Sequence, residues 1–316
     1  KCRVLRIYKP HFEFYGEMSN KLMNLIKKYT PDLEQASIDE CYIDYTKVAY
    51  LYGDYMEFAK KLQLEIKETL GFTVNIGIAN NKLCAKMASD FSKPFKIHTL
   101  FDNEIVDKMY PLPIEELFGI GKKTAPKLRS IGVNTIGDLA NYDNEKLSLY
   151  FKNQAIKMIE LAKGIDNSEV ISEMVEAKGI SHSTTLAKDL TKKSEVYEVL
   201  DKISETLGKE IRKMNKYAYV ITTFVKNSDF VVRSHQIKLE SPTNNTDTIF
   251  RVSKELLDDI WADEKIRLVG IRLNKLTDKR KEQLSIFEES NIKDKEEVLD
   301  KVIDKLKEKY GNNIIK

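Results

Sequence analysis

The chain has 316 residues, of which 42% are hydrophobic and 32% are charged, and its formal net charge at pH 7 is +3. This composition is typical of a soluble globular protein, and the length allows two or three domains. No hydrophobic run approaches the roughly 18 residues of a membrane span, which argues against a membrane protein, and no secretory signal opens the chain.

Cysteine and histidine usage argues against a zinc site or a disulfide framework. The cysteines Cys2, Cys41 and Cys84 form no Cys-x-x-Cys pair, and the four histidines are scattered. A reducing cytoplasm therefore fits this sequence. The charge distribution is more informative than the net charge, because residues 178–280 hold 20 Lys and Arg against 15 Asp and Glu, a difference of +5. The excess positive charge therefore lies in the later part of the chain, which is the kind of distribution that a nucleic-acid-binding region would have.

Residues 1–101 predict a mixed layer of helices and strands. Hydrophobic residues recur at helical spacing in two stretches, and runs rich in β-forming residues follow each of them. We expect helices over 14–29 and 55–70, extended chain over 33–45, a strand over 72–79, and a short helix capped by Asn80 or Asn81 that ends before Pro94.

The rest of the chain divides by composition. Residues 102–164 predict short helices separated by glycines, and the polar stretch 165–177 is a linker. Residues 178–276 predict the ferredoxin-like order β-α-β-β-α-β. Its expected elements are 179–186, 194–214, 217–225, 230–239, 247–260 and 266–273. The charged tail, 277–316, ends in an amphipathic helix with Leu299, Val302, Ile303, Leu306 and Tyr310 on one side.

An acidic cluster interrupts an otherwise hydrophobic, β-prone run at 36–44. Asp39, Glu40 and Asp44 lie within six residues, and carboxylate oxygens are the ligands that Mg²⁺ prefers. In a straight strand Asp39 and Glu40 would point to opposite faces, so a shared metal site requires a bend such as a hairpin tip. Spacing alone favours a plainer explanation, an exposed acidic turn.

A row of cationic side chains follows. Lys82, Lys86, Ser89 and Lys93 are spaced to share one helical face, which could hold phosphates at the start of a capped helix. The commoner explanation of such a row is a solvated face.

A glycine-rich turn lies between two short helical patterns in residues 113–133. Gly119 and Gly121 allow backbone N–H groups to approach a phosphate, and Lys122 and Lys123 add positive charge. The pattern favours a helix-hairpin-helix motif that binds the DNA backbone over a plain turn between helices.

Three large hydrophobic residues stand in the charged tail. Gln283 is followed by Leu284, Ile286 and Phe287, with charged residues on both sides. Exposed hydrophobic anchors of this kind indicate a docking peptide. A short edge strand packed on the preceding domain explains them equally well.

Together these motifs resemble the Y-family (translesion) DNA polymerases over nearly the whole chain, closest to the bacterial DNA polymerase IV group. The resemblance implies an α+β multidomain fold with a partial palm at 1–101, a helix-hairpin-helix thumb at 102–164, a linker at 165–177, a little finger at 178–276 and a tail at 277–316. It also implies a monomeric, DNA-directed DNA polymerase of the bacterial cytoplasm, without membrane attachment, acting in DNA repair and damage tolerance.

The resemblance further assigns roles to residues. Asp39 and Glu40 match the catalytic, metal-binding carboxylates of a two-metal mechanism that uses two Mg²⁺ ions, or Mn²⁺ in their place. Lys93 matches the lysine that contacts the triphosphate of the incoming deoxynucleotide. Expected contacts to primer-template DNA come from Asn81, Lys82, Gly119, Gly121, Lys122 and Lys123, and expected contacts to the sliding clamp come from Gln283, Leu284, Ile286 and Phe287.

The family pattern also contains parts that this sequence lacks. Its members begin with a strand that carries another metal-binding aspartate, then an aromatic residue that excludes ribonucleotides, then the fingers. The present sequence starts at Lys1, where the fingers return to the palm, so we expect an N-terminal segment to be missing. The alternative function is therefore a catalytically inactive, DNA- and clamp-binding fragment.

Overall fold

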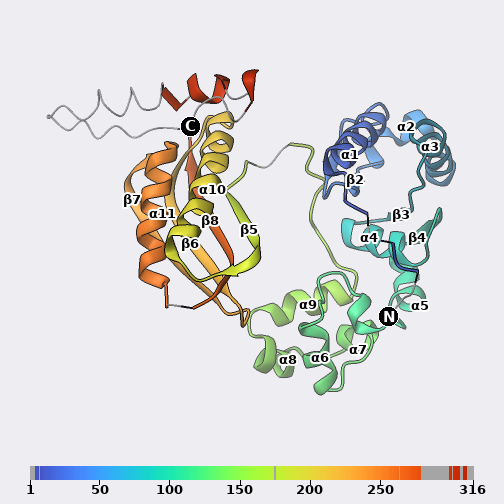
Figure 1. Cartoon of the computed structure of the whole chain (residues 1–316). Helices are drawn as coiled ribbons and strands as arrows, with labels where there is room; N and C mark the ends of the chain where they lie inside the picture. Colours follow the sequence, from blue (N-terminus) through green and yellow to red (C-terminus); the bar gives the residue numbers. More distant parts are fainter. Residues whose placement is uncertain are drawn as a thin grey trace. The chain divides into compact units, whose positions relative to one another are not determined.

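The structure, a computed structural model, describes residues 4–6, 8–173, 176–262, 264–278, 299–300, 302–306 and 309–311. The chain divides into two compact units, Lys1–Met174 and Val175–Lys316, coloured blue to green and yellow to red in Figure 1. Among the described residues, no helix is both long and apolar enough to cross a membrane.

The first unit opens with two helices that cover a short hairpin. Helix α1 (Phe12–Ile26) and helix α3 (Tyr55–Leu70) pack with strands β1 (Leu33–Gln35) and β2 (Cys41–Ile43), which pair in antiparallel fashion. Asp54 caps α3 by accepting hydrogen bonds from two amides of its first turn. The short segments η1 (Thr46–Val48) and α2 (Ala49–Tyr52) connect the hairpin to α3.

A βαβ unit follows. Strands β3 (Ile76–Ala79) and β4 (Ile97–Leu100) run parallel, and helix α4 (Lys82–Asp90) connects them. A Cβ atom on Gly77 would lie 1.9 Å from the Ala85 carbonyl oxygen, so glycine is needed for α4 to pack on β3. The predicted strand 72–79 is shorter than expected, because the Asn75 side chain instead bonds the backbone of Lys96 and Ser89.

The helical part of this unit confirms the short helices predicted over 102–164. These are η2 (Asp102–Glu104), α5 (Ile105–Lys108), η3 (Ile114–Glu116), α6 (Thr124–Ser130), α7 (Ile136–Ala140), α8 (Asn144–Phe151) and α9 (Gln154–Ala162). Their hydrophobic core is continuous with that of α4, because Leu83, Cys84 and Met87 belong to the same buried cluster as Leu128 and Leu147. Helix α4 is therefore held from both sides.

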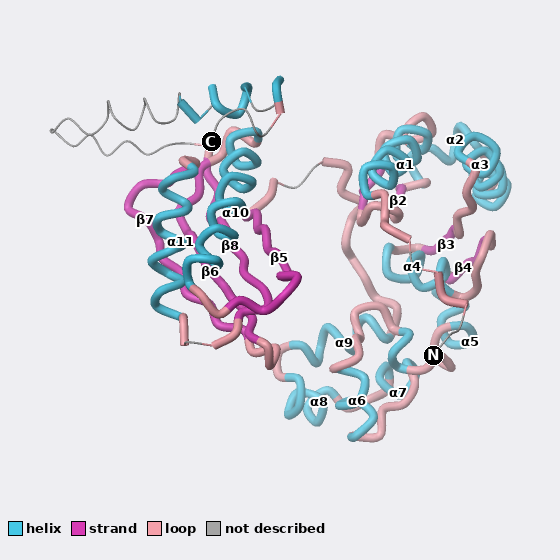
Figure 2. Tube along the Cα trace, viewed as in Figure 1, coloured by secondary structure: helices cyan, strands magenta, loops and turns pink. Residues whose placement is uncertain are grey.

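The second unit confirms the predicted β-α-β-β-α-β order. Its elements are β5 (Gly179–Leu190), α10 (Lys193–Lys213), β6 (Tyr217–Asn227), β7 (Val232–Thr243), α11 (Thr246–Ile260) and β8 (Ile266–Thr277). The strands form an antiparallel sheet in the order β5-β8-β6-β7, so the last strand lies between the first two. Helices α10 and α11 cover one face of this sheet, as Figure 2 shows.

The tail is described only in part. Residues 299, 300, 302–306, 309 and 310 are helical, as predicted. The predicted clamp-binding residues Gln283, Leu284, Ile286 and Phe287 lie outside the described residues.

Candidate functional site

The predicted bend at the acidic run is a hairpin tip. Strands β1 and β2 are joined by a tight turn in which the amides of Ala36 and Ser37 donate to the Glu40 carbonyl, at 3.0 and 3.1 Å. The Ser37 hydroxyl lies 2.7 Å from Asp39 Oδ1 and accepts a hydrogen bond from the Glu40 amide. Because the turn reverses the chain, Asp39 and Glu40 escape the strict alternation of a strand, and both are exposed.

The third acid of the run has a different position. Asp44 Oδ1 accepts a hydrogen bond from the Thr46 amide at 3.0 Å, at the start of η1, away from the turn. Within the described part of the chain, no group of three His, Cys, Asp or Glu side chains is placed to hold a metal ion. The carboxylate oxygens of Asp39 and Glu40 suit a hard cation such as Mg²⁺. Two carboxylates alone supply only some of the ligands that this ion requires.

A chain of alternating charges runs from the hairpin tip along α4. The Lys86 ammonium pairs with Glu40 and lies 3.2 Å from Asp90, and Asp90 in turn lies 2.7 Å from the Lys93 ammonium. Burial alone would lower the pKa of Lys86, but the hydrogen bonds from its ammonium to Glu40 and Asp90 raise that pKa overall. The Lys86 side chain is 15% exposed and that of Lys93 is 61% exposed, so Lys93 is the cation that faces solvent.

Asn81 and Lys82 make internal contacts. The Asn81 side chain caps α4 by accepting from the Cys84 amide at 2.8 Å, and it donates to the Gly164 carbonyl at 2.8 Å. Lys82 donates to both carboxylate oxygens of Glu34. The DNA-binding role expected for these two residues stays a prediction, and their observed contacts hold the start of α4 in place.

The glycine turn differs from the predicted helix-hairpin-helix in one detail. Its first helical segment is the single 3-10 turn η3, and α6 begins after Gly121, whose carbonyl accepts from the Thr124 and Ala125 amides. Gly119 has a φ of +94°, which explains a glycine there. A Cβ on Gly121 would meet nothing within 4 Å and its φ lies outside the left-handed region, so intramolecular packing does not explain the second glycine.

The face of the four-stranded sheet opposite the helices carries side chains that sequence reasoning missed. Thr222, Phe224, Lys226, Leu268 and Arg272 line a hollow of about 310 Å³ on this face. The Arg272 guanidinium lies 5.7 Å from the Phe224 ring centroid, which suits a cation–π contact. Alternation along each predicted strand shows which residues share a face of the sheet. Only the pairing register of β6 with β8 shows which residues of the two strands lie beside one another.

The chain matches sequence profiles of one family along its length. Residues 1–90 match the impB/mucB/samB family, residues 102–133 match the helix-hairpin-helix motif of that family, and residues 177–286 match its C-terminal domain. These three matches follow the order of the hairpin and α4, the glycine turn, and the four-stranded sheet.

Relatives and solved structures agree with this. The chain is 42% identical over its full length to DNA polymerase IV of Clostridium acetobutylicum, of which it covers 79%, and 35% identical to DNA polymerase IV of Alkaliphilus oremlandii, of which it covers 81%. A Y-family DNA polymerase chimera of Dbh and Dpo4 is similar in structure, with a TM-score of 0.74 and 27% identity over 84% of this chain and 77% of the chimera. An insertion ternary complex of Dbh DNA polymerase gives a TM-score of 0.54 and 28% identity over 85% of this chain and 78% of that one. The chain therefore belongs to the Y-family of translesion DNA polymerases, in the group of DNA polymerase IV.

Proposed function

We propose that Asp39 and Glu40 hold divalent metal ions for nucleotidyl transfer, that Lys93 binds the triphosphate of the incoming deoxynucleotide, and that the protein extends primers on damaged templates. The observation that carries the proposal is the hairpin tip, where two exposed carboxylates stand at one end of the ion-pair chain that leads to Lys93. Polymerases of this family use divalent metal ions, and Mg²⁺, two ions per site, fits the carboxylate donors.

The residues of the tip would act by binding and orientation. When bound, the metal ions supply Lewis acidity and lower the pKa of the attacking hydroxyl. Asp39 and Glu40 provide the anionic oxygens, and Ser37 holds Asp39 in orientation through its 2.7 Å hydrogen bond. Lys86 pairs with Glu40, which limits repulsion between the adjacent carboxylates.

Lys93 would act on the nucleotide. Its ammonium is exposed and is steadied by Asp90, so it can meet an anionic triphosphate with little rearrangement. Because Asp90 also pairs with Lys86, the cation for the phosphates and the cation beside the metal-binding carboxylate share one anchor. This arrangement would keep the two parts of the site at a fixed spacing along α4.

DNA would be held through its backbone at two surfaces. The Gly119–Gly121 turn presents open backbone together with exposed Lys122 and Lys123, which suits phosphate contacts independent of base sequence. The open sheet face contributes Lys226 and Arg272. A related polymerase has been solved as an insertion ternary complex, which supports DNA and deoxynucleotides as the partners here.

The sliding clamp remains the proposed protein partner, reached through Gln283, Leu284, Ile286 and Phe287 of the tail. A polymerase with a weak grip on DNA gains effective concentration at the primer end from such a tether. We further propose a monomer that works in the bacterial cytoplasm, in keeping with its bacterial relatives.

Primer extension tests the metal assignment. Asp39→Asn and Glu40→Gln should each abolish extension with Mg²⁺ or Mn²⁺ while leaving DNA affinity within about twofold. Glu57→Gln, which removes an exposed acid on α3, is the matched control and should retain activity. Full activity in either tip variant would refute the assignment.

A second candidate function is DNA and clamp binding without catalysis by the 316-residue chain alone. The lack of a third suitably placed acid among the described residues favours it, because Mg²⁺ tolerates incomplete coordination poorly. DNA and clamp binding by this chain without primer extension would support this second candidate, and primer extension by this chain would exclude it.

A further inference from the structure

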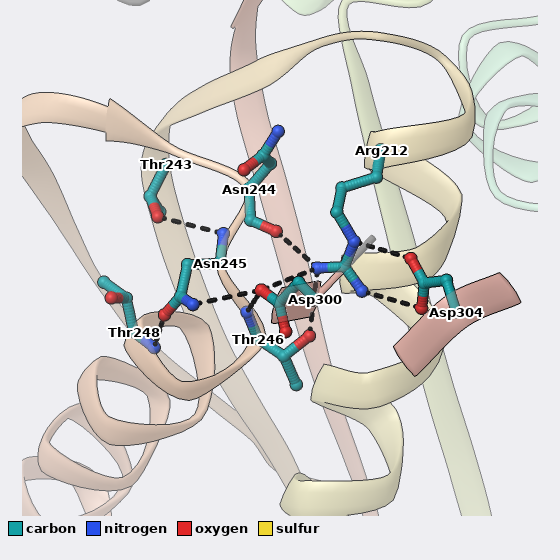
Figure 3. A network of polar contacts seen from close by, with 8 residues as sticks. All are labelled: Arg212, Thr243, Asn244, Asn245, Thr246, Thr248, Asp300 and Asp304. Carbon is teal, nitrogen blue, oxygen red and sulfur yellow. Dashed lines mark hydrogen bonds and ion pairs between the residues drawn. The ribbon is translucent and has the colours of Figure 1, made fainter. Parts of the chain in front are cut away.

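A buried arginine at the end of α10 binds the C-terminal helix. The Arg212 side chain is only 5% exposed, and a buried guanidinium requires anionic partners. Its Nε and Nη2 atoms donate to the two oxygens of Asp304, at 2.7 and 3.0 Å. Its Nη1 atom lies 3.2 Å from Asp300 Oδ2 and donates to the Asn244 carbonyl at 2.7 Å, as Figure 3 shows.

The start of α11 completes the site. Asn245 caps this helix by accepting from the Thr248 amide, and its Nδ2 atom donates to Asp300 Oδ2 at 3.0 Å. The backbone amide of Thr246 donates to the same oxygen at 3.3 Å. Asp300 therefore binds where the first turn of a 15-residue helix offers free N–H groups and a partial positive charge.

A glycine in α10 provides the space that this site needs. Gly208 lies in the interior of α10, toward its C-terminal end, where glycine weakens a helix by about 1 kcal/mol relative to alanine. A Cβ atom there would lie 2.4 Å from Thr246 Oγ1 and 3.0 Å from Arg212 Nη1. Glycine at this position thus lets Arg212 and the start of α11 come together. We call Arg212 and the first turn of α11 the socket.

The C-terminal helix meets the domain through its carboxylates. Asp300, Ile303 and Asp304 share one helical face and are partly buried. By contrast, Leu299, Val302 and Tyr310, which the hydrophobic pattern placed on the apolar side, are 58%, 47% and 57% exposed. Among the described residues of this helix, the ion pairs and hydrogen bonds of Asp300 and Asp304 are accompanied by two partly buried apolar side chains, Ile303 and Leu306.

We propose that Arg212 and the first turn of α11 form a receptor for a helix bearing two carboxylates one turn apart, and that the C-terminal helix of this chain occupies it as a reversible latch. A helix of about 12 residues is only marginally stable alone in water, so docking and helix formation are coupled. An attachment made of ion pairs and hydrogen bonds, with little apolar burial, can open without exposing a hydrophobic core. The proposal is independent of the catalytic assignment.

Amide hydrogen exchange of the full chain tests the latch. In the variant Asp300→Asn with Asp304→Asn, the amides of residues 302–306 should exchange at least tenfold faster, because the released helix unfolds. The amides of α10 and β6 should keep their protection. Lys305→Gln, on an exposed position of the same helix, is the control and should change nothing. Unchanged protection of 302–306 in the double variant would overturn the proposal, as would equal loss in the control.

Binding of a synthetic peptide tests the receptor separately. A synthetic peptide of residues 297–311, added to the double variant, should bind in a calorimetric titration, and the same peptide with both aspartates replaced by asparagine should bind at least tenfold more weakly. Equal binding of the two peptides would show that the carboxylates are not what the socket recognises. Gly208→Ala should weaken binding of the aspartate peptide, since its Cβ crowds the socket.

Discussion

The Lys82 ammonium lies 3.0 and 2.8 Å from the two carboxylate oxygens of Glu34. Glu34 also accepts a hydrogen bond from the Ile171 amide at 2.8 Å. One carboxylate thus joins the strand before the hairpin tip, the first turn of α4, and the segment that follows α9. Lys82 belongs to the row of cationic side chains that could hold phosphates, and in the fold its ammonium pairs with a carboxylate of β1, the first strand of the hairpin.

Loss of the Glu34 carboxylate should destabilise the protein. Glu34→Gln should lower the free energy of unfolding by about 1 to 2 kcal/mol, because Lys82 is then left partly buried with a neutral partner. Glu57→Gln, which breaks the exposed pair with Lys60, should cost less than about 0.5 kcal/mol. Chemical denaturation of both variants at pH 7 measures the difference.

The same carboxylate predicts a pH dependence. Burial alone would raise the pKa of Glu34, but the hydrogen bonds from Lys82 and the Ile171 amide and the charge of Lys82 lower it overall. A lowered folded-state pKa means that this stabilisation is complete above the unfolded pKa of about 4.3 and is lost as the pH falls through the folded value. Melting temperatures of the wild type and Glu34→Gln should therefore converge toward pH 3; a constant gap would contradict this origin.

Removal of Lys86 should strengthen metal binding at the hairpin tip. Its ammonium pairs with Glu40 and so competes with any cation there. Lys86→Met should tighten Mn²⁺ binding to the protein by about tenfold, or 1.4 kcal/mol, in a calorimetric titration. Lys60→Met, at an exposed lysine of α3, should leave the affinity unchanged. Weaker binding in Lys86→Met would mean that Lys86 mainly orients Glu40.

The lysines of the glycine turn should contribute to the salt dependence of DNA binding. Lys122→Ala with Lys123→Ala should flatten the slope of log K against log salt for duplex DNA by about 1.8, since each phosphate contact contributes about 0.9. The adjacent lysines Lys60 and Lys61 of α3, also exposed, provide a double-alanine control of equal charge. An unchanged slope in the turn variant would remove these lysines from the interface.

The two glycines of the turn should respond differently to alanine. Gly119→Ala should destabilise the fold, because φ is +94° there. Gly121→Ala should leave the melting temperature unchanged, because no atom lies within 4 Å of the new Cβ, yet it should weaken DNA binding by keeping the backbone from the phosphate. Equal DNA affinity in Gly121→Ala and wild type would show that this backbone does not approach DNA.

Local patterns predicted much of this fold. Two explanations of the acidic run, an exposed acidic turn and a bent metal site, both place a turn at Asp39 and Glu40, where the structure has the hairpin tip. The alternation of elements from Gly179 onward gave the β-α-β-β-α-β order. Local patterns could not predict contacts between residues far apart in sequence, such as Lys82 with Glu34 or Phe224 with Arg272. The periodicity of a helix or strand shows which face a residue occupies, but it does not show which distant residue lies opposite that face. The contacts of Arg212 with Asp300 and Asp304 are also of this long-range kind.

The latch also has a topological consequence. Asp278 pairs with Lys216 and Asp300 pairs with Arg212, so the chain leaves and rejoins the same domain on either side of residues 279–298. Closing both ends removes in advance part of the chain entropy that a linear tail would lose on binding a partner. If the latch closes, both ends of the segment that carries the proposed clamp peptide are fixed to one domain, which would confine the peptide near that domain. If the latch opens, one end is free and the peptide could reach a more distant partner.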